Sequence, residues 1–411
     1  MSPRTQPPSR RRFLAGAGIA AACWSLPALS RAETGADGLL VLRARSAPPL
    51  WGYNGTVPGP TLRAKRGDEL RVRLVNELAE PTTIHWHGLR LPNAMDGVPQ
   101  LTQPAVAPGA SFDCRFRPPD AGTFWYHAFI PGQVDKGLHG ALIVEEAEPI
   151  EVDRDVVLLL GMPGAADGAS ASVLVNGALR PDIPVKTGER LRLRLINATA
   201  ARGLVLKLDG HAARVMALDG QPAEPFVARD SRVWLGPGGR ADLFIDATHD
   251  GGKVTPILAG VRDEQPIAQL AYASGGAARA TPRAEPRPLP PNPLPARIDL
   301  RGSLKVEMAL ANSKQLDAVG PPLFTVKRGR AVTLAVRNAS GQPQALHVHG
   351  HSFRLLDRLD DGWKPYWLDT LVVGEQVERI AFVADNPGKW LIDCRALERS
   401  DAGTSVWFAV T

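Results

Sequence analysis

Alternating histidines are the strongest chemical signal in this sequence. His347, His349 and His351 lie in one run, and His85 and His87 form a second pair far away in the chain. Residues two apart in a β-strand project from the same face, so the members of each pair can converge on one object. Neutral imidazole is the commonest protein ligand for transition metals. The pattern predicts a metal site, and the alternative is a set of buried histidines held by hydrogen bonds.

The segments around these histidines have the pattern of short β-strands. Residues 70–75 and 83–87 alternate in side-chain character, and turn sequences such as Pro58-Gly59-Pro60 separate such stretches. The chain contains 40 Gly and 37 Pro among its 411 residues, which also favours short strands joined by turns. This spacing is typical of β-sandwiches and not of alternating strands and helices.

A weak internal repeat indicates three copies of one unit. A turn, an alternating strand and an Asn recur at residues 66–76, 186–197 and 327–338. We therefore expect an all-β protein of three consecutive Greek-key β-sandwich domains, at residues 33–148, 149–278 and 299–411. The Pro-rich segment at 279–298 is expected to be an extended linker between the second and third domains.

The first 32 residues have the pattern of a twin-arginine export signal. Residues 9–14, Ser-Arg-Arg-Arg-Phe-Leu, precede an apolar run from Ala15 to Leu29 and a small-residue site at Ala32. We expect export to the periplasm, cleavage after Ala32 and no transmembrane segment in the mature chain. A membrane helix and a lipoprotein anchored at Cys23 are the alternatives. Without the five arginines of this segment, basic and acidic side chains are nearly equal in number, so nucleic acid is not an expected partner.

Five segments resemble the multicopper oxidases, laccase-like proteins built from three cupredoxin domains. They are His85-Trp86-His87-Gly88, Gly122–His127, His347–Phe353, Asp385–Trp390 and the segment around Cys394. The resemblance covers nearly all of the chain after the signal and implies three cupredoxin-like domains. In that family a type 1 copper takes electrons from a substrate and passes them to a three-copper cluster. Eight imidazoles hold this cluster, which reduces dioxygen to water.

The resemblance assigns five surviving ligand positions in the cluster. His85 and His347 match the type 2 ligands, His87 and His127 match two ligands of one type 3 copper, and His349 matches one ligand of the other. The predicted cofactor is therefore copper, bound by these imidazoles.

Two further positions keep a possible metal donor, and the others are substituted. Asp393 stands where an imidazole is expected and could bind copper through oxygen, and Cys394 matches the type 1 thiolate. The substituted positions are Phe129 and Arg395 in the cluster, and Gln344, Arg399 and Thr404 around the type 1 copper. Phenylalanine has no donor atom, and arginine keeps its positive charge in proteins. The copper complement is expected to be reduced or absent, with no blue copper.

Two functions are compatible with this ligand set. The first is a copper-poor binding or scaffolding protein of the cell envelope, which would act on an envelope protein partner. The second is a copper-dependent, laccase-like oxidoreductase that works with a reduced copper complement on a small-molecule reductant. The first is favoured, because a blue copper site needs two imidazoles beside the thiolate and electrons would otherwise lack an entry route.

Neighbouring side chains carry separate expectations. Asp393 and Arg395 share a strand face, so the guanidinium is expected to pair with the carboxylate and fill vacant copper volume. Arg399 is expected to lower the pKa of the Cys394 thiol and make it reactive. The remaining histidines and Cys114 are not expected to bind metal. We expect His351 to be a packing residue, His139 and His211 to belong to the framework, His249 to be solvated and Cys114 to lie in the core.

Overall fold

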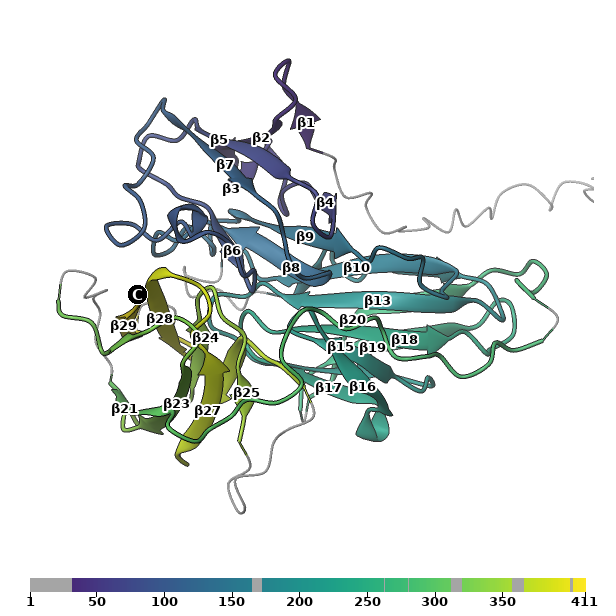
Figure 1. The fold of residues 1–411 in the computed structure, drawn as a ribbon. Coiled ribbons are helices and arrows are strands. Elements are labelled where there is room, and N and C mark those ends of the chain that lie inside the picture. Colours follow the sequence, from purple (N-terminus) through teal and green to yellow (C-terminus); the bar gives the residue numbers. More distant parts are fainter. Residues whose placement is uncertain are drawn as a thin grey trace, which may run out of the picture.

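The computed structural model describes residues 32–164, 172–261, 263–279, 281–311, 320–356, 366–399 and 402–411. Apart from Ala32, the predicted export signal lies outside these residues. Within them, no helix has the length and apolarity needed to cross a membrane. Almost all regular structure is β-strand, as the short alternating segments predict, and six sheets pair into three sandwiches (Figure 1). The all-β prediction of three cupredoxin-like sandwich domains is confirmed.

The first sandwich contains nine strands and a short 3-10 helix. One sheet contains β1 (Glu33–Thr34), β2 (Leu40–Ala47), β5 (Leu70–Asn76) and β7 (Ser111–Phe116), with β3 (Leu50–Tyr53) paired to β2. The other has the order β4 (Leu62–Lys65), β9 (His139–Glu145), β8 (Gly122–His127) and β6 (His85–His87). The helix η1 spans Asn93–Met95. Alternate residues of β5 are buried, and they pack with Trp86 and Cys114 in one core, where Cys114 was expected.

The second sandwich has the largest sheet. Its order is β11 (Leu174–Val175), β10 (Arg154–Gly161), β13 (Arg190–Asn197), β18 (Arg240–Asp246), β15 (Arg214–Leu218) and β16 (Gln221–Val227). The facing sheet has β12 (Asp182–Val185), β20 (Gln265–Tyr272), β19 (Val254–Ala259), β14 (Leu204–Leu208) and β17 (Arg232–Leu235). The 3-10 helix η3 spans Arg229–Ser231.

The third sandwich contains the second histidine run. One sheet has the order β21 (Leu304–Leu310), β23 (Ala331–Asn338), β27 (Glu378–Val383) and β25 (Arg354–Leu355). The other has β22 (Thr325–Val326), β29 (Gly403–Val410), β28 (Gly388–Ala396), β24 (Gln344–Val348) and β26 (Thr370–Val373). In Figure 1, β24 and β28 lie beside β6, where the first and third sandwiches meet.

The three copies of the sequence repeat form equivalent strands. Each copy pairs in parallel with an earlier strand of its sheet: β5 with β2, β13 with β10, and β23 with β21. Each also pairs antiparallel with a later strand: β7, β18 or β27. The repeat therefore marks one structural position in three sandwiches. The exact domain boundaries stay predictions.

The Pro-rich segment predicted as a linker packs closely against the two sandwiches before it. Leu289 is buried with Met216 and Phe244 of the second sandwich. The side chain of Asn292 accepts a hydrogen bond from the Ala121 amide at 2.9 Å and donates one to the Ala121 carbonyl at 2.8 Å. The segment is extended, but its contacts connect it to both the first and the second domain.

Candidate metal centre

Five imidazoles from two sandwiches converge at the meeting of β6, β8 and β24. The rings of His87 and His347 stack with centroids 3.8 Å apart, and those of His85 and His349 lie 4.1 Å apart. The register of β6 and β8 pairs His85 with His127, whose rings are 5.2 Å apart. The structure thus brings together all five histidines that the sequence assigned to one site.

The strand predicted through His351 is shorter than expected. β24 ends at Val348, and Gly350 has a left-handed backbone with φ of 65°. A Cβ there would lie 2.4 Å from the ring of Trp390, so only glycine fits this turn. The turn still directs His349 into the cluster, while His351 packs against Phe382 and Trp390 as predicted.

Hydrogen bonds to Nδ1 orient four of the five rings. Nδ1 lies 2.8 Å from the Asp96 carbonyl in His85, 2.9 Å from the Ala128 carbonyl in His127, and 3.0 Å from the Asp369 carbonyl in His347. Nδ1 of His349 lies 3.0 Å from a carboxylate oxygen of Asp96. We assign the proton to Nδ1 in each ring, because all these partners are acceptors.

The opposite ring nitrogen, Nε2, is left with a lone pair in each of these histidines. It is buried without a hydrogen-bond partner among the described residues in His85, His127, His347 and His349. A buried acceptor without a partner is costly, so its presence in four neighbouring rings makes them a candidate metal site. His87 is reversed: its Nε2 lies 3.1 Å from Thr370 Oγ1, which leaves Nδ1 for a metal.

Burial favours the neutral form of four of these imidazoles. It lowers the pKa of His87 and His127 well below the ordinary value, and neighbouring imidazoles and arginines lower them further. Burial also lowers the pKa of His347 and His349, although Asp369 and Asp96 oppose the shift. Neutral imidazoles with free lone pairs are the form that binds metal, so protons do not compete for the nitrogens of these four rings near neutral pH.

Asp96 and Asp369 are functional residues that sequence reasoning missed. A carboxylate of Asp96 contacts both His85 and His349, at 3.3 and 3.0 Å. Burial alone would raise the pKa of Asp96, but His349 and His85 hold it below its ordinary value. The only sequence signal was that Asp369 interrupts an apolar run, where a charged residue needs a partner.

That partner comes from the second sandwich. Arg240, fully buried on β18, donates two hydrogen bonds to the Asp369 carboxylate at 2.8 and 2.5 Å and a third, at 3.3 Å, to the carbonyl of Thr123 in the first sandwich. Asp369 also accepts a hydrogen bond from the Thr370 hydroxyl, which contacts His87. The second sandwich supplies no imidazole to the cluster. Its Arg240 nevertheless holds Asp369 in place, and Asp369 and its neighbour Thr370 contact the rings of His347 and His87.

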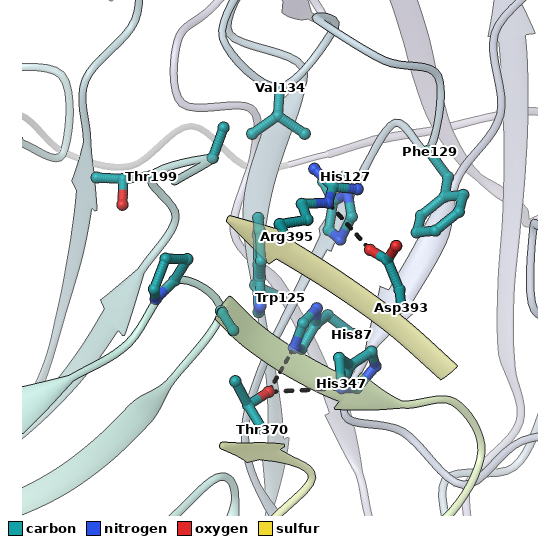
Figure 2. Close-up of a pocket in the computed structure, with 14 residues that line it drawn as sticks. His87, Trp125, His127, Phe129, Val134, Thr199, His347, Thr370, Asp393 and Arg395 are labelled. Carbon is teal, nitrogen blue, oxygen red and sulfur yellow. Dashed lines mark hydrogen bonds and ion pairs between the residues drawn. The ribbon is translucent and has the colours of Figure 1, made fainter. Parts of the chain in front are cut away.

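The substituted cluster positions form a small cavity beside the histidines (Figure 2). Its volume is about 40 Å³, enough for two or three water molecules. The predicted pair forms: Arg395 Nε donates to Asp393 at 3.0 Å. The other oxygen of Asp393 accepts the Ser405 hydroxyl at 2.7 Å. Phe129 instead packs with Val98 and Leu391, sealing the contact between first and third domains.

Two polar side chains at the type 1 position bond to the backbone of one residue, while Gln344 Oε1 is buried without a hydrogen-bond partner among the described residues. Cys394 is 1% exposed and lies in the core of the third sandwich, on the face of β28 opposite Asp393 and Arg395. The backbone of Ala311 accepts from Gln344 Nε2 at 3.1 Å and from Thr404 Oγ1 at 2.7 Å. Within the described residues, no group of three metal-binding side chains includes Cys394.

The prediction that Arg399 activates Cys394 is wrong. Burial raises the pKa of the thiol well above its ordinary value, and the charge of Asp393 raises it further. A thiol in this environment is protonated at neutral pH and reacts slowly. Cys394 therefore belongs to the core and offers no thiolate in this state.

The other histidines lie apart from the cavity. His139 is buried on β9, directly opposite His127 of β8. His211 Nε2 lies 2.6 Å from the Tyr272 hydroxyl, so both are framework residues as expected. His249 is only partly exposed and its ring meets His211 and Tyr272, so the prediction of a solvated side chain is wrong.

Comparisons with known proteins agree on one family. Three family models described as "Multicopper oxidase" match residues 40–149, 106–265 and 289–411. A multicopper oxidase of Staphylococcus aureus is 30% identical over 88% of this chain and 83% of its own length. The crystal structure of a multicopper oxidase from Pseudomonas thermotolerans is 33% identical, with a TM-score of 0.79 over 90% of this chain and 98% of that one. Copper resistance protein A of Escherichia coli is 28% identical over 57% of this chain and 49% of its own length.

Proposed function

We propose that this chain, which belongs to the multicopper oxidases, is a copper-poor member of that family. It acts in the cell envelope by binding copper and an envelope protein, and not by laccase-type turnover. The observation that carries the proposal is the contrast between four unpartnered Nε2 atoms in the histidine cluster and the type 1 position, where Gln344 and Thr404 bond to Ala311. The same chain keeps donors at one site and has replaced them at the other.

The donor set of the cluster fits copper. His85 and His347 would hold one ion, and His87 and His127 would hold a second, with His349 beside them. Copper bound there would supply a redox-active, Lewis-acidic cation. The protein's own part is to present neutral imidazoles, fixed by Asp96, Asp369 and backbone carbonyls.

The donor set of the type 1 position does not fit copper. Gln344 and Thr404 are engaged with Ala311, and within the described residues no group of three metal-binding side chains includes Cys394. Without imidazoles beside the sulfur, no blue copper site can form. Electrons from a reductant would then have no relay to the cluster, which favours binding over oxidation.

The place of action is also part of the proposal. The twin-arginine pattern of the first 32 residues supports export to the periplasm, with an envelope protein as the partner. The relative named for copper resistance supports a role in copper binding.

The test is a metal count joined to a spectrum and a dye-oxidation assay. We expect copper-loaded mature protein to hold fewer ions than a type 1 site and a three-copper cluster would, to show no intense blue absorption, and to oxidise dye no faster than free copper. A His85→Gln/His347→Gln double variant is the matched control and should lose most of the bound copper. Blue colour with turnover would contradict the proposal, and so would metal-free wild-type protein.

A second candidate is an oxidoreductase that uses the reduced copper complement on a small-molecule reductant. It is favoured by the cavity beside His127 and His347, which is large enough for dioxygen. Turnover that the double variant abolishes, in protein without blue absorption, would support this candidate over the first.

A further inference from the structure

The second sandwich carries the exposed apolar side chains of this molecule. Among the residues that the structure describes, six large apolar side chains are at least 41% exposed, and all six belong to this domain. They are Leu179, Phe226, Val227, Trp234, Val254 and Val261. The described parts of the first and third sandwiches, which hold the histidine cluster, have none. Groups of exposed apolar side chains mark contact surfaces on soluble proteins.

Three of these side chains lie at one edge of the sandwich. Phe226 and Val227 end β16, the last strand of one sheet, and Trp234 lies in β17, the last strand of the other. The short helix η3 connects the two strands, so they form the same edge, and Figure 1 shows both on the side of the second sandwich away from the first. A hollow of about 670 Å³ lies beside them, lined in part by Val227 and Arg232. This edge therefore offers projecting apolar side chains and a recess.

β17 is also the least protected edge strand of this domain. Natural sheets protect their edges with proline, with charge or with very short strands. Among the described strands, β16 contains Pro222 and Pro225, β12 contains Pro184, and β11 has only two residues. β17 has four residues and no proline. Its one charged side chain, Arg232, is paired with Glu264 of the same chain.

The peptide groups of Trp234 face outward from this edge. Val205 of β14 lies opposite Trp234, and its carbonyl accepts a hydrogen bond of 3.0 Å from the Gly260 amide on the other side of the strand. Both peptide groups of a residue in an antiparallel strand point to one side, so Val205 faces away from β17 and does not bond Trp234. The N–H and C=O of Trp234 then point toward the open edge, where another strand can reach them.

The ring of Trp234 is held in place before any contact forms. It is 49% exposed, yet it lies against the backbone of Gly203, where an added Cβ would overlap the indole. A side chain that is already ordered loses little conformational entropy when a partner buries it. Tryptophan is also one of the residues that contribute most to protein–protein interfaces. Trp234 therefore has the properties of an interface anchor.

The charges around this edge are balanced. Lys207 pairs with Asp209 at 2.9 Å, and Arg232 pairs with Glu264. Such a rim has no excess of either sign to attract nucleic acid or an anionic membrane, and it can meet the same rim on a second copy without net repulsion. In an antiparallel pair centred on Trp234, Arg232 of each copy lies diagonally across from the partner's indole, within reach of a cation–π contact.

We propose that two copies of this chain associate through β17, with the two strands antiparallel about a twofold axis at Trp234. Each Trp234 donates its N–H to the Trp234 carbonyl of the other copy, and the two indoles lie on one face of the joined sheet. The two five-stranded sheets become one sheet of ten strands. Phe226 and Val227 of both copies meet at the same edge. No metal ligand takes part, so the inference is independent of the proposed function.

The test is the mass of the mature protein in solution at several concentrations, measured by sedimentation. The wild type should approach twice the mass of one chain as its concentration rises, because an edge contact is small and its dimer is weak. Trp234→Lys places a charge at the axis and should raise the dimer dissociation constant at least about 30-fold. Leu179→Lys is the matched control and should associate as the wild type does. Leu179 is 51% exposed but lies between β11 and β12, at the opposite edge of the sandwich.

Hydrogen exchange of the wild type is a second readout that needs no variant. The Trp234 amide should exchange at least about tenfold more slowly at concentrations where the dimer forms, since its N–H is then bonded. A wild type that stays monomeric would overturn the inference, and so would a dimer that Trp234→Lys leaves intact or that does not protect this amide. Protection of the amide by an added envelope protein, in a chain that does not self-associate, would assign the edge to a different partner and also overturn it.

Discussion

The two faces of strand β28 have different surroundings. On the face toward the first sandwich, Asp393 and Arg395 line a cavity and the surrounding imidazoles keep free lone pairs. On the other face, Cys394 is enclosed in an apolar core, and Gln344 and Thr404 bond to a backbone segment. The first face meets imidazoles with unpartnered nitrogens, whereas the second is packed among apolar side chains. In terms of the proposed function, the two sets of substituted positions therefore differ in whether they leave donors for a metal.

The largest expected effect comes from Arg240, which holds Asp369 beneath the imidazole cluster. Arg240→Gln would leave the Asp369 carboxylate buried and unpaired, and we expect it to lower the free energy of unfolding by about 3–5 kcal/mol. Arg240→Lys keeps the charge but not the two parallel hydrogen bonds, and should weaken copper binding about 10–100-fold in protein that still folds. Urea denaturation and chelator competition measure the two effects. Wild-type copper affinity in Arg240→Lys would show that the cluster does not depend on the second sandwich.

Removal of one proposed metal ligand, His347, should have the next largest effect, in this case on copper affinity. His347→Ala should weaken copper binding by at least about 100-fold, since even supporting residues of metal ligands contribute 10–100-fold. His249→Gln is the control, because this partly exposed ring lies in the second sandwich, which supplies no ligand. If both variants bound copper equally, the convergence of imidazoles would be structural only.

A substitution on the face of β28 that carries Cys394 should change the stability of the protein and not its copper content. Gln344→Ala removes a fully buried side chain that bonds the Ala311 carbonyl, and we expect a loss of about 1–3 kcal/mol in the free energy of unfolding. Copper content should not change. Gln342→Ala, two residues earlier and exposed, should leave both unchanged. A drop in copper content with Gln344→Ala would mean that the two faces are one site.

The last prediction concerns the pH dependence of the stability of metal-free protein. Burial lowers the pKa of His139 and of His351 to about 4, so between pH 6.5 and 4 the unfolded chain binds protons that the folded chain does not. Each histidine then lowers stability by about 1.4 kcal/mol for each unit that the pH falls. The pKa of Asp219, raised by burial to about 6, opposes this from about pH 6 downward.

Chemical denaturation across this range should show stability that falls with pH. The slope should be shallower in His139→Gln by about the share of one histidine. A slope that is the same in wild type and His139→Gln would contradict a neutral, buried His139.

Residue spacing predicted the local parts of both faces, and the family resemblance predicted that the five histidines converge, but the other long-range contacts were missed. Alternation in a strand was enough to place His85 with His87 and to pair Asp393 with Arg395, because two-residue spacing fixes the face. It could not show Arg240 behind Asp369, since 129 residues separate them and no spacing rule connects them.

The same limit explains the error at Cys394. Arg399 is near it in sequence, but strand alternation directs the thiol into the core, where burial dominates its pKa. Gln344 and Thr404 bond to the backbone of Ala311, and a backbone acceptor leaves no side-chain pattern that sequence analysis could detect.

Asn292 has a consequence for how the molecule comes apart. Its side chain bonds to Ala121 in the first sandwich and to Gln221 in the second, although it belongs to the segment that leads into the third. A connector bound in this way presents few free peptide groups to a protease, despite a composition typical of cleavable linkers. The connector thus joins the first and second sandwiches to each other, and these two domains should unfold together.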